Sequence, residues 1–529
     1  MNRFIKRANA RVSFGGAATL LVGVTLAGQA MGFLRNRLIS ANFTRLDPGS
    51  SDAFFAAFQI PDFFYYTIAA GALGVAFIPF LSDRLQAGDK KGVWELASSL
   101  LNLLAIAMGV VGVIAFVFAR PLIHTLAPNL PPDHLQQAVS IARLVAFNPL
   151  LFTLSGIITS LQQTFGRFFF YAVAPLFYNL CIIASIYIFR SNLGIVGLGV
   201  GALAGGILQL IVACLGLIGL GFRYRPRIRF GNPNFRGILR QLPARSLDQG
   251  IDQVNSIVEV NRAQALSVGA VSYYSYALTL QNVPIMLLGN SIAIAAFPRL
   301  TERLSQNRPD LFRKDFLNVL RGMIWVAMPV VVVSYFARGY LARLIFGDQA
   351  PQVALIFGFL AISILFRIIY SMLSRYFYAY KDTKTPLYVS IFAIGLNIFL
   401  AFNLARPDAY GIAGLAIAQS IVAACEVAIL FLIIMVRDIK LFNLAFWAGM
   451  MRIISVTGFS VVAAFIMISF LPLNISDRGI VTLGSKLSAI AGATLVTHVL
   501  ISALMGLPEV RPIIRKVKQI ILKPIRVDV

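Results

Sequence analysis

Residues 246–264 read SLDQGIDQVNSIVEVNRAQ, and whether this segment crosses a membrane sets the topology of the whole chain. It contains Asp248, Asp252, Glu259 and Arg262. Taken alone, it is typical of an amphipathic helix in a soluble domain. Long apolar runs precede and follow it, however, and a polar segment between membrane spans has a different meaning from one in a soluble chain.

The composition indicates an integral membrane protein. The 529 residues are 58% hydrophobic and only 13% charged, yet 46 Lys and Arg stand against 21 Asp and Glu, a formal net charge of +25. Soluble chains are nearer half apolar and a quarter charged, and disordered chains have low hydrophobicity. Nucleic-acid-binding domains carry basic residues on a polar surface, whereas membrane proteins confine them to loops between spans. The composition therefore disfavours all three soluble classes.

Residue types typical of enzymes and metal sites are scattered. Cys181, Cys214 and Cys425 lie inside apolar stretches without disulfide or metal-ligand spacing. We find neither a phosphate-binding Gly-Lys-Ser/Thr loop nor a Ser/His/Asp arrangement. We expect a transporter and not an enzyme, with no resident cofactor. Any coupling would use ions or the membrane potential.

Apolar runs of about 20 residues, the length that spans a bilayer, recur along the chain. With the polar segment included, they predict an all-α polytopic membrane protein of fourteen spans. The predicted spans are 15–42, 53–81, 94–119, 136–163, 168–189, 193–221, 244–266, 270–298, 316–345, 352–379, 385–405, 410–436, 445–472 and 482–506.

The distribution of basic residues favours counting 244–266 as a span. With the N-terminus in the cytoplasm, 33 of the 46 Lys and Arg residues fall in cytoplasmic segments, as the positive-inside rule requires. Without the seventh span every later loop would change sides, and this asymmetry would be lost. We therefore expect both termini in the cytoplasm.

An internal repeat explains why a polar segment is a span. The motif PFLSDRL (79–85) closes the second span, and PRLTERL (298–304) closes the eighth, 219 residues later. At the same offset, Gln29 and Asn36 of the first span align with Asp248 and Asn255 of the seventh. Parallel repeats of this kind are typical of transporters that work by alternating access. Chance similarity among apolar helices is the alternative.

The repeat predicts two lobes of six helices each and two extra C-terminal helices. The predicted divisions are an N-lobe at 1–222, a C-lobe at 223–440, spans 13 and 14 at 441–507, and a basic cytoplasmic tail at 508–529.

Polar side chains inside spans are costly in lipid and usually face a cavity. Gln29, Arg35 and Asn36 of the first span recur at helical spacing, which predicts a hydrated stripe. Spans 1 and 7 together are predicted to line a polar cavity, with Glu259 among its charges. Asp52, at the start of the second span, has the position of that helix's N-cap.

Several motifs together resemble the MurJ (MviN) family of lipid II flippases, within the multidrug/oligosaccharidyl-lipid/polysaccharide (MOP) exporter superfamily. The resemblance covers spans 1–12 and the count of fourteen. The motifs are GFLR (32–35), SDAFFAAFQIP (51–61) leading to GA (71–72) and AFIP (76–79), Asn179 after Ala174-Pro175, QVN (253–255) and FYAYKDTKTP (377–386).

The resemblance implies a flippase of the bacterial cytoplasmic (inner) membrane. Its partner would be an undecaprenyl-pyrophosphate-linked cell-wall precursor, lipid II, carried from the inner to the outer leaflet. Two lobes would rock about a cationic cavity, and spans 13 and 14 would form a groove for the lipid tail. The resemblance further implies contact with membrane lipids, no nucleic acid partner and a monomeric protein.

The resemblance also assigns candidate site residues. The substrate-binding set is Arg35, Gln29, Asn36, Asp52, Tyr65, Gln253 and Asn255, with Arg35 as the phosphate contact. Glu259 stands where family members often have an acid associated with a sodium ion, and Asp382 is assigned to the same region. Sodium is accordingly the expected coupling ion.

The cavity has fewer arginines than the resemblance predicts. Gln29 and Tyr65 stand where arginines are expected, and Asn36 stands where an acid is expected. A diphosphate requires strong cationic donors, which Arg37, Arg143 and Arg367 would have to supply beside Arg35. Two alternatives therefore stay open. One is a MOP-type flippase or exporter for another lipid-linked saccharide or amphiphile, and the other is a transport-inactive membrane scaffold.

Overall fold

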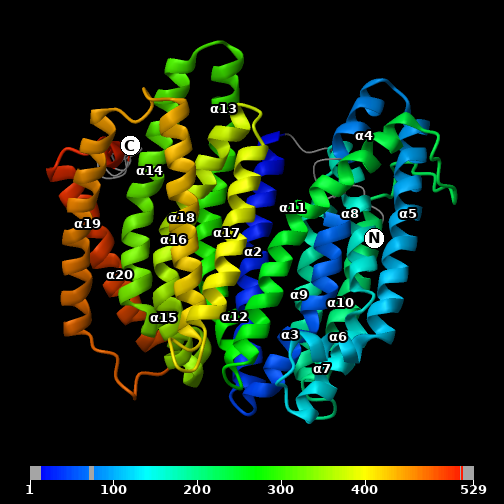
Figure 1. Cartoon of the computed structure of the whole chain (residues 1–529), viewed down its shortest axis with the longest axis horizontal. Coiled ribbons are helices and arrows are strands. Elements are labelled where there is room, and N and C mark those ends of the chain that lie inside the picture. The colour runs from blue at the N-terminus through cyan, green and yellow to red at the C-terminus, as the bar shows by residue number, and fades with distance from the viewer. Residues whose placement is uncertain (1–13, 71–76, 513, 516–529) are drawn as a thin grey trace, which may run out of the picture. The chain divides into compact units, whose positions relative to one another are not determined.

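The computed structural model describes residues 14–70, 77–512 and 514–515, and within them every regular element is a helix (Figure 1). The predicted all-α polytopic fold is thereby confirmed. Three parts of the sequence analysis lie outside the described residues. They are the basic N-terminal segment within residues 1–13, the motif residues at 71–72 and 76, and most of the predicted tail. The chain divides into two compact units, Met1–Ser275 and Tyr276–Val529.

The first unit contains twelve helical elements in its described part. They are α2 (Phe14–Ile39), η1 (Ser40–Thr44), α3 (Pro48–Phe64), η2 (Tyr65–Ala70), α4 (Phe77–Gln86), α5 (Lys90–Val117), α6 (Ala119–Leu126), α7 (Pro132–Val145), α8 (Asn148–Thr164), α9 (Phe169–Phe189), α10 (Val196–Leu215) and α11 (Pro233–Gln264).

Helix α12 (Ala270–Pro284) contains the boundary between the units, and the second unit follows it. Within the second unit, α19 and α20, drawn in orange and red, run side by side (Figure 1). Its elements are η4 (Ile285–Asn290), α13 (Ser291–Ser305), α14 (Pro309–Phe336), α15 (Arg338–Phe346), η5 (Gly347–Gln349), α16 (Ala350–Ala379), α17 (Lys384–Leu404), α18 (Ala413–Arg437), α19 (Leu444–Phe470), α20 (Gly479–Leu504) and η6 (Pro508–Val510).

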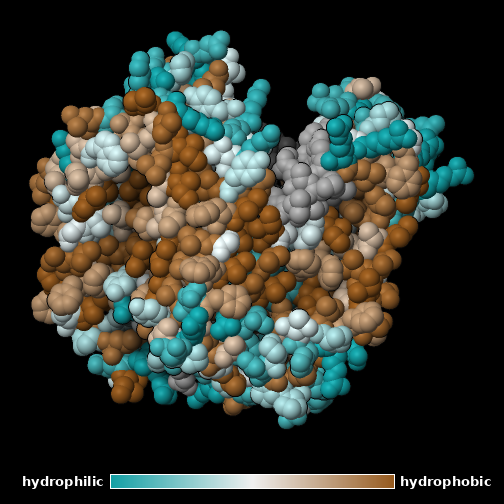
Figure 2. All heavy atoms as spheres, in the orientation of Figure 1, coloured by the Kyte–Doolittle hydropathy of each residue, from teal (hydrophilic) through white to brown (hydrophobic). Residues whose placement is uncertain are grey.

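Eleven helical segments in the described part of the chain are long and apolar enough to cross a membrane. The described residues of the other three predicted spans also lie on helices, namely α2 for the first span, α3, η2 and α4 for the second, and α11 for the seventh. A count of fourteen is compatible with these helices. Hydrophobic side chains gather over the middle of the helices and hydrophilic ones at their ends (Figure 2), as expected where a bilayer surrounds the middle.

Helix α11 shows why the polar segment folds as it does. It begins eleven residues before the predicted span, at Pro233, because Asn232 accepts a hydrogen bond from the Asn234 N–H at 3.0 Å and Pro233 suits the first helical position. Its 32 residues extend over roughly 48 Å at the usual rise. The polar segment is therefore the second half of a helix long enough to cross a bilayer.

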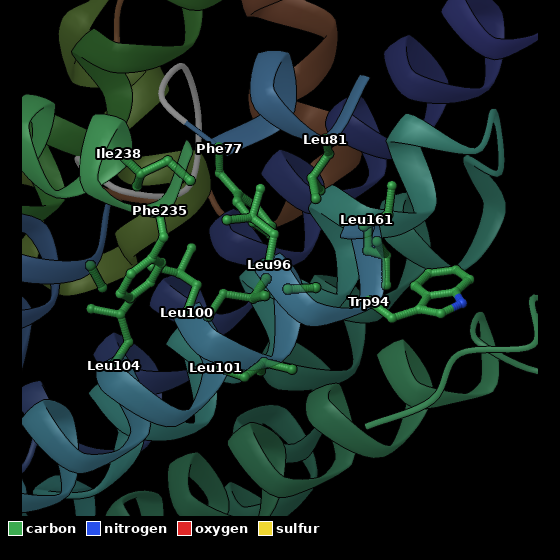
Figure 3. Packing of buried hydrophobic residues seen from close by; sticks show 14 of the residues in the cluster. Phe77, Leu81, Trp94, Leu96, Leu100, Leu101, Leu104, Leu161, Phe235 and Ile238 are labelled. Carbon is green, nitrogen blue, oxygen red and sulfur yellow. The ribbon is translucent and has the colours of Figure 1, made fainter. Parts of the chain in front are cut away.

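The first half of α11 is anchored in a hydrophobic core. Phe235 and Ile238 are fully buried in one cluster, and Phe235 lies beside Leu100 and Leu104 of α5 (Figure 3). In the same cluster the Trp94 ring stacks on the ring of Phe165, the residue that follows α8, with 5.2 Å between the ring centroids. This core fixes the start of α11 and so the register of the polar residues that follow.

Two π-helices occur at nearly the offset of the sequence repeat. Element η2 follows Pro61 of α3, and η4 follows Pro284 of α12. A proline inside a helix removes a backbone donor, and π-helical turns are frequent at functional sites. The unit boundary at 275/276 differs from the predicted lobe boundary at 222/223, but compactness and repeat register are separate properties. The lobe boundaries stay a prediction.

Candidate functional site

Arg35 lies on α2 where this helix packs against α9. Its Nη1 donates to Asn179 Oδ1 at 3.0 Å, and its Nε donates to Asn36 Oδ1 at 3.2 Å. Asn36 is buried, and Arg35 is half-buried. Two amide oxygens therefore orient a guanidinium that keeps part of its surface accessible.

The charge of Arg35 is partly compensated inside the first unit. Asp62 of α3 interacts electrostatically with Arg35, and Tyr178 of α9 lies within the field of both groups. A cation within a membrane span is costly unless it faces water or an anion. Asp62 is therefore the counter-charge of Arg35 in the first unit when its carboxyl is ionised.

The neutral residues predicted beside Arg35 lie on two elements. Gln29 is half-buried on α2, six residues before Arg35. Tyr65 is the first residue of η2, and its ring meets the Phe152 ring edge-on at 5.8 Å between centroids. At Tyr65 the chain therefore has an aromatic contact in place of a cation.

A second polar group lies on α11, which packs against α3 and η2. Asn255 donates to Glu259 Oε1 at 3.1 Å, one turn apart on the same face. Ser256 donates to Gln59 of α3 at 3.0 Å. Glu259 is buried, and Gln253 is half-buried.

Helix α3 interacts with both polar groups. Gln59 accepts the hydrogen bond from α11, and Asp62, three residues later, interacts with Arg35. Residues at this spacing share one helix face. The structure thus links the Arg35 group and the Glu259 group through a single turn of α3.

Asp52 has a different structural position from the predicted N-cap. The N-cap of α3 is Asp47, so the prediction that Asp52 caps its own helix is wrong. Instead the fully buried Asp52 carboxylate accepts from the Gly269 N–H at 2.6 Å and from the Ser272 N–H and hydroxyl at 2.8 and 2.7 Å. Asp52 therefore holds the start of α12 against α3.

Asp382 lies in the turn before α17. Its carboxylate accepts hydrogen bonds from Thr385 and from the Lys384 N–H, and it pairs with Arg437 at the end of α18. The described residues contain no group of three or more His, Cys, Asp or Glu side chains that could hold a metal ion. The sodium assignments stay a prediction.

Two of the substitute arginines have partners of their own. Arg367 of α16 pairs with the buried Glu426 of α18 at 2.9 Å. Arg143 is exposed, and its guanidinium lies 5.8 Å from the centre of the Phe116 ring. Neither contact is part of the Arg35 group described above.

Sequence reasoning missed two partners of Arg35. Asn179 entered only as a motif residue, and Asp62 was left out of the substrate-binding set. The available signal was position, since Asp62 follows Pro61 directly and Asn179 follows Pro175 by one turn. Polar residues next to a proline inside apolar helices are candidates for such a site.

Comparison with known proteins identifies the fold and the family. A family model described as "Lipid II flippase MurJ" matches residues 49–477. A probable lipid II flippase MurJ of Borreliella burgdorferi is 24% identical over 80% of this chain and 84% of that protein. One of Rhizobium meliloti is 27% identical over 72% and 74%.

Solved structures have the same fold. A lipid II flippase MurJ in an inward closed conformation matches with a TM-score of 0.75 at 20% identity, over 94% of this chain and all of that one. An inward-facing multidrug resistance MATE family transporter of the MOP superfamily matches with a TM-score of 0.65 at 16% identity, over 80% and 99%. The motifs, the helical fold and the match over most of the sequence agree, and the chain belongs to the lipid II flippase MurJ family.

Proposed function

We propose that this chain carries lipid II from the inner to the outer leaflet of the bacterial inner membrane, by alternating access of two lobes. It acts as a monomeric transporter and not as an enzyme, with both termini in the cytoplasm. Family membership supports the cargo, and the asymmetry of basic residues supports the orientation.

One observation carries the proposal, namely the held guanidinium of Arg35. Asn36 and Asn179 fix its plane from two sides. A planar guanidinium presents paired donors that fit phosphate oxygens. An oriented and partly accessible arginine is suited to contact the diphosphate, while the polyprenyl chain stays in an apolar environment.

Asp62 sets the strength of that contact. When its carboxyl is ionised, Asp62 offsets the charge of Arg35 and repels a diphosphate that approaches. Weak binding of the diphosphate favours its release, and a carrier must release its cargo as well as bind it. The same observation supports a second candidate function, the export of a lipid-linked saccharide or amphiphile without a diphosphate, because Gln29 and Tyr65 add no positive charge.

The deciding experiment is rescue of a bacterium depleted of its own lipid II flippase. The wild-type chain is expected to restore growth, and Arg35→Ala is expected to abolish rescue at equal membrane abundance. Arg143→Ala is the matched control, since it removes an exposed arginine that contacts an aromatic ring, and it should rescue. Undiminished rescue by Arg35→Ala would overturn the assignment of Arg35.

A second measurement separates the candidate cargoes. Absence of rescue by a correctly inserted wild-type chain would reject lipid II as cargo. Binding of purified protein to lipid-linked saccharides with and without a diphosphate would then distinguish the exporter from the transport-inactive scaffold, which binds neither.

We also propose Glu259 as the acid associated with a sodium ion, with Asn255 as its neighbour. Rescue by the wild-type chain should weaken when sodium is replaced by potassium in the medium. Glu259→Gln should rescue equally poorly in both media. A Glu259→Gln variant that keeps the sodium dependence would contradict this role.

A further inference from the structure

A basic pocket lies in the second unit between the first turns of α14 and the start of α19. Its volume is about 350 Å³. One wall is formed by α14, where the lining residues Arg313, Leu317 and Arg321 recur every four residues and Lys314 lies next to Arg313. The other wall is the segment that leads into α19, with Lys440 and Asn443. Four basic side chains and one exposed acid, Asp310, thus line one small cavity, and Asp310 pairs with Arg313 at 3.0 Å.

Two of these side chains already have counter-ions. Arg313 donates through Nε to both carboxylate oxygens of Asp438 at 3.0 and 2.8 Å. Arg321 pairs with the buried Glu509 at 2.6 Å. The first pair joins α14 to the segment before α19, and the second joins α14 to η6. Both pairs leave little charge on the two arginines for a ligand.

The two lysines are different. Lys314 and Lys440 are exposed, and neither has an ion-pair partner in the part of the chain that the structure describes. The first turn of α19 adds the positive end of a helix, where Asn443 already accepts from the Phe446 N–H at 2.9 Å. The uncompensated positive charge is therefore concentrated on the two lysines beside a helix start.

The residues that flank the pocket are apolar and face outward. Ile439 and Leu444 are 84% and 86% exposed, and Trp447, one turn into α19, is 43% exposed. Exposed aliphatic side chains next to a tryptophan are typical of the level where acyl chains meet headgroups. A ligand with both an anionic head and an apolar tail would match this arrangement, whereas a free phosphate would use the lysines alone.

We propose that this pocket binds the headgroup of an anionic phospholipid. The phosphate lies between Lys314 and Lys440, and the acyl chains contact Ile439, Leu444 and Trp447. The predicted topology places this end of α14 and α19 on the cytoplasmic side, and basic pockets between spans on that side are suited to anionic headgroups. The site is separate from the Arg35 group and does not depend on the identity of the transported cargo.

The test measures lipid binding to the purified full chain in detergent. Phosphatidylglycerol is titrated in parallel with phosphatidylcholine, and bound lipid is counted by native mass spectrometry. The Lys314→Gln/Lys440→Gln double variant is expected to bind phosphatidylglycerol about 25-fold more weakly than the wild type, from about five-fold for each lysine. Lys90→Gln/Lys91→Gln is the matched control, since it removes two exposed lysines at the start of α5, and it should keep wild-type affinity.

Two results would overturn the proposal. Equal binding of phosphatidylglycerol by wild type and the Lys314/Lys440 double variant would show that the pocket is not the site. Inorganic phosphate that competes with phosphatidylglycerol at equal affinity, and only when both lysines are present, would show that the ligand is a free phosphate. Thermal unfolding of each variant without lipid verifies that the comparison concerns folded protein.

Discussion

At the scale of single residues, the carboxylate of Asp52 on α3 accepts three hydrogen bonds, from the Gly269 N–H and from the Ser272 N–H and hydroxyl. An Asp52→Asn exchange keeps the shape but leaves one oxygen, so an amide N–H₂ would face the Gly269 or Ser272 N–H. The loss of at least one hydrogen bond to a charged group should reduce the free energy of unfolding by about 1.5–3 kcal/mol. Unfolding of the purified variant in detergent measures this. Asp83→Asn, at an exposed position, should leave the stability unchanged, and an equal loss there would contradict the assigned role.

Asp382 predicts how stability depends on pH. Burial raises the pKa of its carboxyl, but the Thr385 hydroxyl and N–H and the Arg437 guanidinium lower it further, to about 2 against an ordinary 3.8. A folded-state pKa below the unfolded value means that the stabilisation is present above about pH 4 and is lost as pH falls towards 2. The stability difference between wild type and Asp382→Asn should therefore shrink over that interval. A stability difference that stays constant with pH would contradict this role of Asp382. The control is Asp408→Asn, in an exposed loop, whose stability difference from the wild type should not depend on pH in this way.

Sequence alone located part of the Arg35 group. Arg35 and Asn36 are neighbours in the chain, and their helical spacing from Gln29 was visible. Asn179 is 144 residues away, and its contact exists because α2 packs on α9, which no local pattern specifies. Asp52 was misread for a related reason, since its hydrogen-bond donors lie at the start of a distant helix.

At the scale of elements, α11 approaches η2 so closely that Gly250 has no room for a large side chain. A Cβ there would lie 3.0 Å from Thr67 Oγ1. Gly250→Leu should push α11 away from η2, lower the stability by about 1–3 kcal/mol and reduce rescue of the flippase-depleted cell. Gly458→Leu, on α19 with nothing within 4 Å of its Cβ position, should be tolerated. Full stability and rescue by Gly250→Leu would contradict the close approach.

The helix boundaries were predictable where the length of an apolar run sets them. They were less predictable where a proline sets them. The predicted span 136–163 is two helices, α7 and α8, because Pro149 occupies the first turn of α8. The turn into π-helix after Pro61 and Pro284 likewise left no signature in hydropathy. The early start of α11 could have been read from Asn232-Pro233, a capping pair outside the apolar window.

At the scale of the whole molecule, the side of the membrane on which each loop lies follows from whether α11 crosses. We expect that a single cysteine at Asn307, in a chain without its three native cysteines, is protected from a membrane-impermeant maleimide in intact cells, and that one at Asp408 is labelled. If α11 did not cross, both loops would change sides, so the labelling would be reversed while a cysteine at Gly88 stayed protected. Labelling after membrane disruption serves as the control for reactivity at each site. The reversed pattern would leave the net charge of +25 unexplained. The basic loops after α11 would then face the outside of the cell, against the positive-inside rule.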